Sequence, residues 1–153
     1  MGRPPVNTRF DVRLLSWSDA LPLARPVRER VFVEEQGVPR ELEWDDWDVR
    51  SEHAVAIDEE GGAIGTARLL PDGHIGRMAV LARWRGRGVG SALLDALLER
   101  AKARRMPSVR LNAQTHAAGF YRRFGFAADG AEFVEAGIPH VEMTLTLPPP
   151  PGA

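Results

Sequence analysis

The amino-acid sequence predicts an α+β fold: a mixed, mainly antiparallel sheet with helices on both faces and one parallel β-α-β crossover. Short runs that alternate apolar and polar residues, separated by glycine- and proline-containing turns, predict antiparallel strands. One long amphipathic helix lies between two such runs, at 75–80 and 109–113. Parallel neighbours need a crossover of this kind, so these two strands are expected to be parallel.

Length and composition limit the possibilities further. With 153 residues, 44% of them hydrophobic, the chain predicts a single domain over 9–147, with flexible ends at 1–8 and 148–153. The 20 basic and 21 acidic residues nearly balance, so no nucleic-acid partner is expected. Cysteine is absent, which excludes disulfides, thiolate metal sites and a cysteine nucleophile. No apolar run is long enough for a membrane span, so we expect a cytoplasmic protein without a membrane partner.

The first half of the chain predicts strands interrupted by helical and loop segments. Alternation over 9–15 predicts a half-buried strand, and a broken helix follows up to residue 37, with Pro26 at a helix start. The segment 40–52 has no steady periodicity and predicts a long loop. Runs at 53–58 and 63–70 predict a hairpin.

The second half is built on the crossover. Its long helix carries one apolar face, formed by Leu93, Leu94, Leu97, Leu98 and Ala101. Beyond the strand at 109–113, the pattern predicts a short helix at 117–124 and an antiparallel pair at 131–135 and 140–147.

The turn between the strand at 75–80 and the long helix has the sequence RGRGVG at 85–90. Glycines let backbone N–H groups converge on an anion, and a helix N-terminus adds the positive end of its dipole. A glycine-rich loop without a ligand is the alternative, but the interleaved arginines and the position before a helix favour phosphate binding. The nucleotide-triphosphate loop and the dinucleotide fingerprint are both excluded, because the lysine of the first and the last glycine of the second are missing.

Two motifs in this order give the chain a family resemblance. The strand end Met78 to Val80 with RGRGVG at 85–90, followed by AGFYRRFGF at 118–126, resembles the GNAT family of acetyl-CoA-dependent N-acetyltransferases. The segments at 31–36, 45–48, 65–69 and 137–140 look like its ElaA-like branch, so the resemblance covers nearly all of 12–147. One departure is Ala82, where many members have proline.

The resemblance implies a fold in which two strands splay at a bulge and hold acetyl-CoA between them. It implies an N-acetyltransferase that moves an acetyl group to an amine by direct attack in a ternary complex; an acyl-CoA sensor or interaction module without turnover is the alternative. Tyr121 matches the general acid. Residues expected to contact acetyl-CoA are Met78, Val80, Arg85, Gly86, Arg87, Gly88, Val89, Gly90, Ser91 and Asn112. A homodimer is an expectation of the family alone.

The general base is less well marked in the sequence. Glu35 and His140 are the candidates, since both lie in segments that match the narrower branch and both are groups that accept a proton near neutrality when suitably placed. An exposed glutamate and a histidine satisfied by backbone are the alternatives for each. The other histidines are scattered without ligand spacing, so no metal is predicted.

An acidic and tryptophan-rich stretch at 41–48 suggests the acceptor's character. Its five acidic residues would form a negative mouth for a cationic amine, with Trp44 and Trp47 covering its apolar stem. A solvated loop pinned by the two tryptophans is the alternative. The sequence does not identify the amine.

Overall fold

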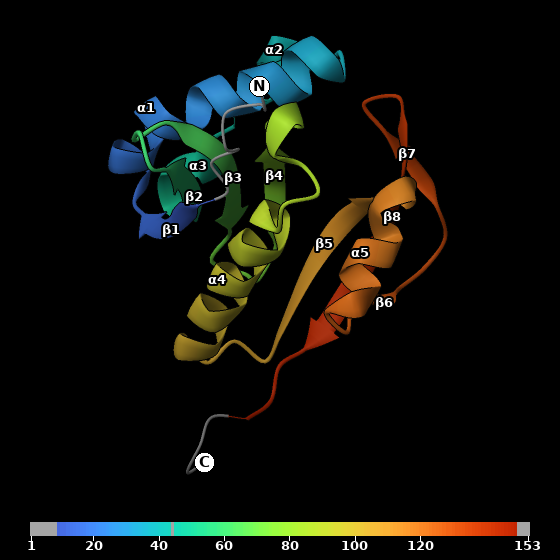
Figure 1. Ribbon diagram of the computed structural model, residues 1–153. Helices are drawn as coiled ribbons and strands as arrows, with labels where there is room; N and C mark the ends of the chain where they lie inside the picture. The colour runs from blue at the N-terminus through green and yellow to red at the C-terminus, as the bar shows by residue number, and fades with distance from the viewer. Residues whose placement is uncertain (1–8, 44, 150–153) are drawn as a thin grey trace, which may run out of the picture.

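The computed structural model describes residues 9–43 and 45–149, and its strands form two four-stranded sheets that diverge from each other (Figure 1). The first sheet contains, in spatial order, β1 (Phe10–Leu15), β2 (Glu52–Asp58), β3 (Ala63–Leu69) and β4 (Ile75–Val80), all antiparallel. In the second sheet, β8 (Ile138–Thr146) pairs with β5 (Ser108–Gln114), β6 (Ala127–Ala128) and β7 (Phe133–Glu135). The α+β class and the mainly antiparallel pairing are therefore confirmed, and β6 is a strand that the sequence did not predict.

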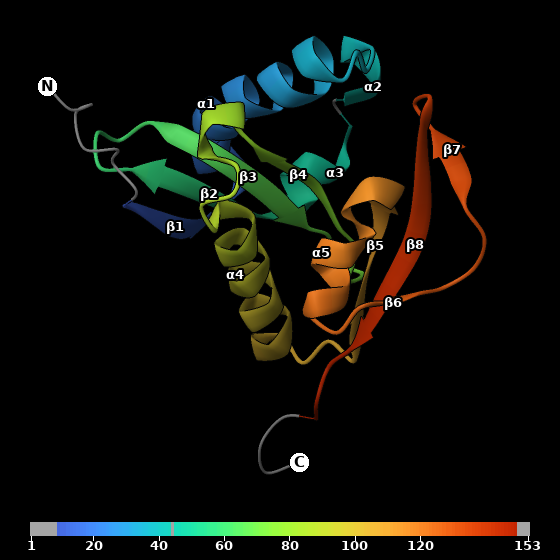
Figure 2. The ribbon, with the colours of Figure 1, turned by 45° about the vertical axis from the view of Figure 1, so that its right-hand side comes forward.

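The crossover β4-α4-β5 joins the two sheets, with α4 spanning Val89–Ala103. A parallel bridge between His74 and Arg110 connects the beginnings of the two strands, and the Arg110 N–H donates to the Gly73 carbonyl at 3.1 Å. Beyond this point β4 and β5 separate (Figure 2). The predicted single sheet is thus two sheets that meet at one parallel bridge, because a bulge in β4 turns the strand away from its neighbour.

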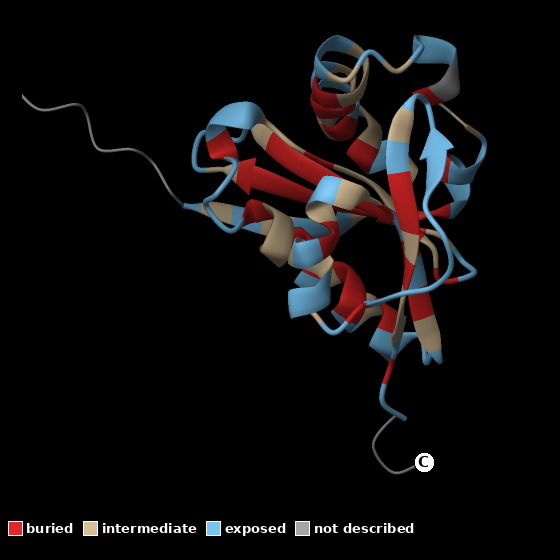
Figure 3. Ribbon diagram, turned by 90° about the vertical axis from the view of Figure 1, so that its right-hand side faces the viewer, coloured by how far each residue is buried: buried red, intermediate tan, exposed pale blue. Residues whose placement is uncertain are grey.

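Helices cover both faces of the first sheet, as predicted. On β2, Ala54 and Ala56 belong to the core cluster that contains the α4 leucines, whereas Val55 belongs to a cluster with Ala20 of α1 (Trp17–Arg28). Neighbouring residues of a strand point to opposite faces, so α4 and α1 lie on opposite sides. Figure 3 shows buried residues running along the strands and the inner sides of the helices.

The first helix differs from its prediction. It begins after Ser16, runs through Pro22 and Pro26, and continues as a π-helix, η1 (Glu29–Glu35). The predicted helix start at Pro26 is wrong, since packing of the buried face of α1 outweighs the cost of about 3 kcal/mol that a proline brings to a helix interior. The helix therefore reaches far enough to place Glu35 at the gap between the sheets.

The segment after this helix is not a loop. It contains two short helices, α2 (Arg40–Glu43) and α3 (Trp47–Arg50), each too short for a sequence period to reveal. The remaining helical elements are η2 (Ala82–Trp84), η3 (Thr115–Ala117) and α5 (Ala118–Arg123). Among the described residues, no helix is both long and apolar enough to span a bilayer. Most of the predicted flexible ends, 1–8 and 150–153, lies outside the described residues.

Candidate functional site

The gap between the diverging sheets is a cleft of about 1050 Å³. Its walls come from η1, β4, β5, α5 and the turn between β7 and β8, and they also include Glu43, Asp45 and Trp47 and, on β3, Arg68. It brings together seven residues predicted from the sequence for catalysis or acetyl-CoA contact: Glu35, Met78, Val80, Arg85, Asn112, Tyr121 and His140. The others, Gly86, Arg87, Gly88, Val89, Gly90 and Ser91, form the turn that continues from Arg85 and the first turn of α4.

The end of β4 presents a backbone N–H to this cleft. Leu81 donates its N–H to Ile64 on β3 at 2.9 Å, which makes these two residues a hydrogen-bonded pair of the antiparallel ladder. Such pairs alternate with pairs whose polar groups point outward. Val80, paired with Gly65, is of the second kind, so its N–H points away from β3 and toward β5.

The turn at 85–90 contains two glycines in the left-handed backbone region. Gly86 and Gly88 have φ of 75° and 84°, a region that other residues rarely adopt, and a Cβ at either position would meet nothing within 4 Å. Gly88 is also the N-cap of α4. Val89 is buried in the core, so it anchors the turn, and the exposed part of the turn at 85–88 is free to face a ligand.

Two predicted site residues pair with each other across the cleft. Arg85 donates from Nη2 to the Glu35 carboxylate at 2.8 Å and from Nε to the Val80 carbonyl at 3.0 Å. The predicted base and the predicted phosphate-binding arginine thus form an ion pair at the end of β4. The other arginine of the turn, Arg87, has its guanidinium over the Trp84 ring, 5.5 Å from the centroid.

Tyr121 lies on α5 with its ring packed edge-on against Phe120 and Phe126, at centroid distances of 5.0 and 6.0 Å. Its hydroxyl is 3.8 Å from the Met78 sulfur on β4. Burial raises the pKa of Tyr121 to about 12. The hydroxyl therefore keeps its proton throughout the physiological pH range and faces β4 as a donor.

His140 is held in one tautomer by β8. Its Nδ1 lies 2.7 Å from the Ile138 carbonyl, and because a carbonyl only accepts, Nδ1 carries the proton in the neutral ring. Nε2 then has a free lone pair and lies 3.9 Å from the Glu135 carboxylate. The ring stacks on Phe133 at a centroid distance of 5.8 Å. Sequence reasoning missed Glu135 and Phe133, although the tight turn at 136–137 places both beside His140.

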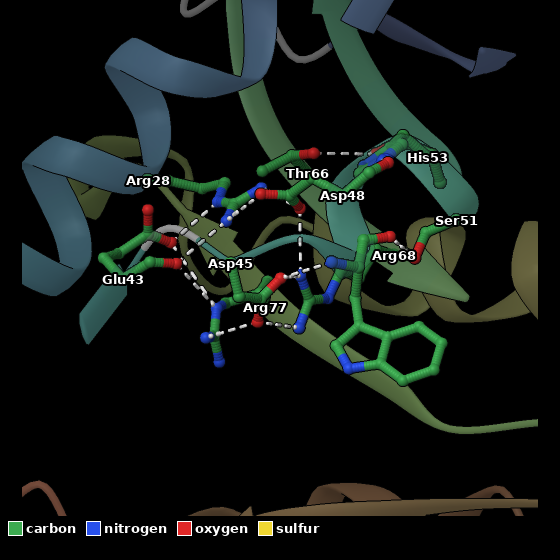
Figure 4. Close-up of polar contacts among 11 residues, drawn as sticks. Arg28, Glu43, Asp45, Asp48, Ser51, His53, Thr66, Arg68 and Arg77 are labelled. Carbon is green, nitrogen blue, oxygen red and sulfur yellow. Dashed lines mark hydrogen bonds and ion pairs between the residues drawn. The ribbon is translucent and has the colours of Figure 1, made fainter. Parts of the chain in front are cut away.

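Three carboxylates of the acidic stretch, Glu43, Asp45 and Asp48, form an ion network with arginines (Figure 4). The Arg28 guanidinium contacts Glu43 at 2.7 Å and Asp48 at 2.8 Å. Arg68 contacts Asp48 at 2.9 Å and binds Asp45 through two hydrogen bonds of 2.7 and 2.9 Å. The predicted negative mouth is wrong for these three carboxylates, since arginines neutralise them.

The alternative, a solvated loop, is also wrong for this part of the stretch. Glu43 and Asp48 are each 2% exposed, whereas Glu41 and Asp46 are exposed. Trp47 lines the cleft, and Trp44 lies outside the described residues. The sequence contains a signal for the missed partners, Arg28 and Arg68. Each arginine stands at a position of its helix or strand where the pattern predicts a buried residue, and a buried guanidinium needs an acidic partner.

The network shifts the pKa of its members in different directions. Burial raises the pKa of Glu43, while the hydrogen bonds from Arg68 lower the pKa of Asp45. Burial lowers the pKa of His53, whose Nε2 donates to the Asp48 carbonyl at 2.8 Å. Within 9–43 and 45–149, no three histidine or carboxylate side chains gather in a way that could hold a metal ion.

Comparisons with known proteins agree with this geometry. A family described as the Acetyltransferase (GNAT) domain matches residues 24–147. The Bacillus subtilis protein YjcF, described as an uncharacterized N-acetyltransferase, is 41% identical over 121 residues, which cover 76% of this chain and 86% of YjcF. Two crystal structures each cover 89% of this chain and have 99% of their own length matched. They are an acyl-CoA N-acyltransferase from Pseudomonas aeruginosa, 30% identical with a TM-score of 0.79, and Escherichia coli ElaA, 29% identical with a TM-score of 0.78.

Proposed function

The chain belongs to the GNAT family of acyl-CoA-dependent N-acetyltransferases, and we propose that it moves an acetyl group from acetyl-CoA to an amine by direct attack in a ternary complex. The observation that carries this proposal is the cleft between β4 and β5. A strand edge with an outward N–H, a half-buried tyrosine and a histidine with a free lone pair all line it. A cysteine-linked acyl-enzyme is excluded, since the chain has no cysteine.

The turn at 85–90 fits the pyrophosphate of coenzyme A. Its backbone N–H groups, those of the first turn of α4 and the Ser91 hydroxyl would hold the phosphates, and the open space beside Gly86 and Gly88 leaves room for them. The backbone of Met78 and Val80 and the Asn112 side chain would hold the pantetheine arm along β4. When bound, acetyl-CoA supplies an activated acyl group and a thiolate leaving group.

Of the two candidate bases, His140 is better prepared than Glu35. The Glu35 carboxylate is already bound by the Arg85 guanidinium, whereas His140 lines the cleft and its Nε2 keeps a lone pair. We propose that His140 accepts the proton of the attacking amine, directly or through a water molecule. Glu135, 3.9 Å from Nε2, would stabilise the resulting imidazolium.

Two further groups would act on the acetyl group and the sulfur. The Val80 N–H, aimed at the cleft, would stabilise negative charge that develops on the carbonyl oxygen. The Tyr121 hydroxyl, which is protonated at neutral pH, would donate its proton to the leaving thiolate. The proton taken by His140 and the proton given by Tyr121 balance over one turnover once solvent re-equilibrates both side chains.

Thiol release from acetyl-CoA in the presence of a pooled amine library tests this function. We expect release that depends on both substrates, and an N-acetylated product by mass spectrometry. Binding of coenzyme A without turnover on any amine would instead identify an acyl-CoA-binding module. The library should include neutral and polycationic amines, because arginines neutralise three of the five carboxylates of the acidic stretch, Glu43, Asp45 and Asp48, and only Glu41 and Asp46 stay exposed. A cytoplasmic location and a homodimer stay predictions; light scattering measures the second.

A further inference from the structure

The bulge in β4 decides which way the Val80 N–H points. Before the bulge, the N–H of Leu70 donates to His74 at 2.7 Å, and Arg68 pairs with Gly76. Continued without interruption, this register would make residues 80 and 64 a hydrogen-bonded pair, because such pairs recur every second residue. The Val80 N–H would then be used in the ladder with β3. One extra residue in β4 shifts the register and turns this N–H outward.

The bulge is a strained conformation that needs support. Arg77, at its centre, has φ of 49°, which is uncommon for a residue with a side chain. Such conformations cost about 1–3 kcal/mol and persist where surrounding contacts fix them. The support is therefore expected among the groups that contact Arg77 and the strand opposite.

Asp45 provides contacts to both strands at this point (Figure 4). Its two carboxylate oxygens accept from the two terminal nitrogens of Arg68 on β3, at 2.7 and 2.9 Å. One of these oxygens also accepts from Arg77 on β4, at 3.2 Å, and the Arg77 Nε donates to the Glu43 carbonyl at 3.2 Å. A single carboxylate thus ties Arg77 in the bulge to Arg68 on the opposite strand.

We propose that Asp45 is a positioning residue for acetyl transfer: it fixes the β4 bulge and so keeps the Val80 N–H aimed at the substrate carbonyl. This inference rests on the proposed function. Asp45 lines the cleft, and its carboxylate binds Arg68 and Arg77; among the described residues none of its hydrogen bonds goes to the turn at 85–90. Loss of Asp45 is therefore expected to reduce the rate of the chemical step and to leave acetyl-CoA affinity nearly unchanged.

The variant Asp45→Asn keeps the side-chain size and removes the charge and one acceptor oxygen. We expect kcat to fall by at least about tenfold, since small misplacements of a catalytic group have effects of this order or larger, and the Kd of acetyl-CoA to change by less than about threefold. Arg28→Lys is the matched control. Arg28 shares the acceptors Asp48 and the Glu43 carbonyl with Arg68 and Arg77, but the Asp45 carboxylate binds Arg68 and Arg77 directly. Arg28→Lys therefore weakens the same network while the Asp45 bonds remain, and kcat should fall much less than in Asp45→Asn.

Hydrogen exchange at the Val80 amide separates this proposal from a purely structural role. In the wild type this N–H lies outside the β3–β4 ladder and should exchange faster than that of Leu81, which is bonded to Ile64. If the bulge relaxes in Asp45→Asn, the Val80 N–H enters the ladder and its exchange should slow. The same change should be absent from Arg28→Lys.

An Asp45→Asn protein that is folded and has wild-type kcat and wild-type Val80 exchange would overturn the proposal. An equal loss of kcat in both variants would also overturn it, because the effect would then be general destabilisation. If the wild type showed no turnover on any amine, the proposed function would fail, and the exchange rate of Val80 would still decide whether Asp45 holds the bulge.

Discussion

At the scale of single residues, Tyr121 and His140 show how neighbours set the pKa of one side chain and the tautomer of another. The chain contains one tyrosine, and its burial against two phenylalanines keeps the hydroxyl protonated. His140 is fixed in one tautomer by a single backbone carbonyl. Neither effect is visible in the identity of the residue: the motifs predicted the two positions, and the surroundings that set the pKa and the tautomer come from the fold.

Tyr121→Phe should lower kcat by about 10²-fold or more if the hydroxyl is the general acid, because the phenyl ring keeps the packing and loses the proton. The KM for acetyl-CoA should change little. Since the pKa of Tyr121 is raised to about 12, its ionisation should not reduce wild-type kcat below about pH 10. Steady-state kinetics from neutral to alkaline pH measure both effects, and an unchanged kcat would remove Tyr121 from this role.

The pair of variants His140→Gln and Glu35→Gln identifies the base. We expect His140→Gln to lower kcat/KM for the amine by about 10²-fold, and Glu35→Gln to have a smaller effect on that ratio. The physical reason is that Glu35 is already bound to Arg85, while Nε2 of His140 is free to accept. The reverse order of effects would assign the base to Glu35 and contradict the proposal for His140.

At the scale of elements, the turn at 85–90 and helix α4 were predictable, and the segment 40–50 was not. A fifteen-residue helix with a leucine stripe gives a strong period, and all four leucines of that stripe are buried. The helices α2 and α3 have four residues each, less than two turns. Their positions are set by ion pairs to arginines on α1, β3 and β4, and contacts between segments so distant have no local signature.

Gly88→Glu should abolish acetyl-CoA binding. Its φ of 84° disfavours any side chain, and a carboxylate at the N-cap of α4 would occupy the phosphate position with like charge. Gly130→Glu is the matched control, because Gly130 has φ of 98°, is exposed and has open surroundings outside the cleft. Isothermal titration of both variants checks this, and retained affinity in Gly88→Glu would show that the phosphates bind elsewhere.

At the scale of the whole molecule, the candidate cleft is the space between two sheets that share one parallel bridge. The sequence predicted the crossover that joins them, and the family resemblance implied their separation. The residue patterns alone predicted one sheet rather than two. The bulge that separates the sheets depends on a register shift opposite Arg68 and on an ion network from other elements. Strand patterns report which face is buried and carry little information on a one-residue bulge.

A ligand that bridges the two sheets should stabilise the fold as a unit. At about 100 times its Kd, acetyl-CoA should add about 2.7 kcal/mol to the free energy of unfolding. For a chain of this size the melting temperature should rise by about 5–10 °C. Differential scanning fluorimetry measures this, with dephospho- or adenine-only fragments as controls for partial occupancy. An acetyl-CoA concentration series without any rise would contradict binding in the cleft.

The neutrality of the ion network constrains how this sequence can change over time. Arg28, Arg68 and Arg77 face Glu43, Asp45 and Asp48, so one replaced member leaves an uncompensated charge, a change that costs about 3–5 kcal/mol when the pair is buried. The total free energy of unfolding of a typical domain is only about 5–15 kcal/mol. We therefore expect that related sequences change these positions in pairs, so that an arginine and its carboxylate partner are replaced together. A library of single and double variants at these six positions tests this. We expect single replacements to lower the yield of folded protein and some double replacements to restore it.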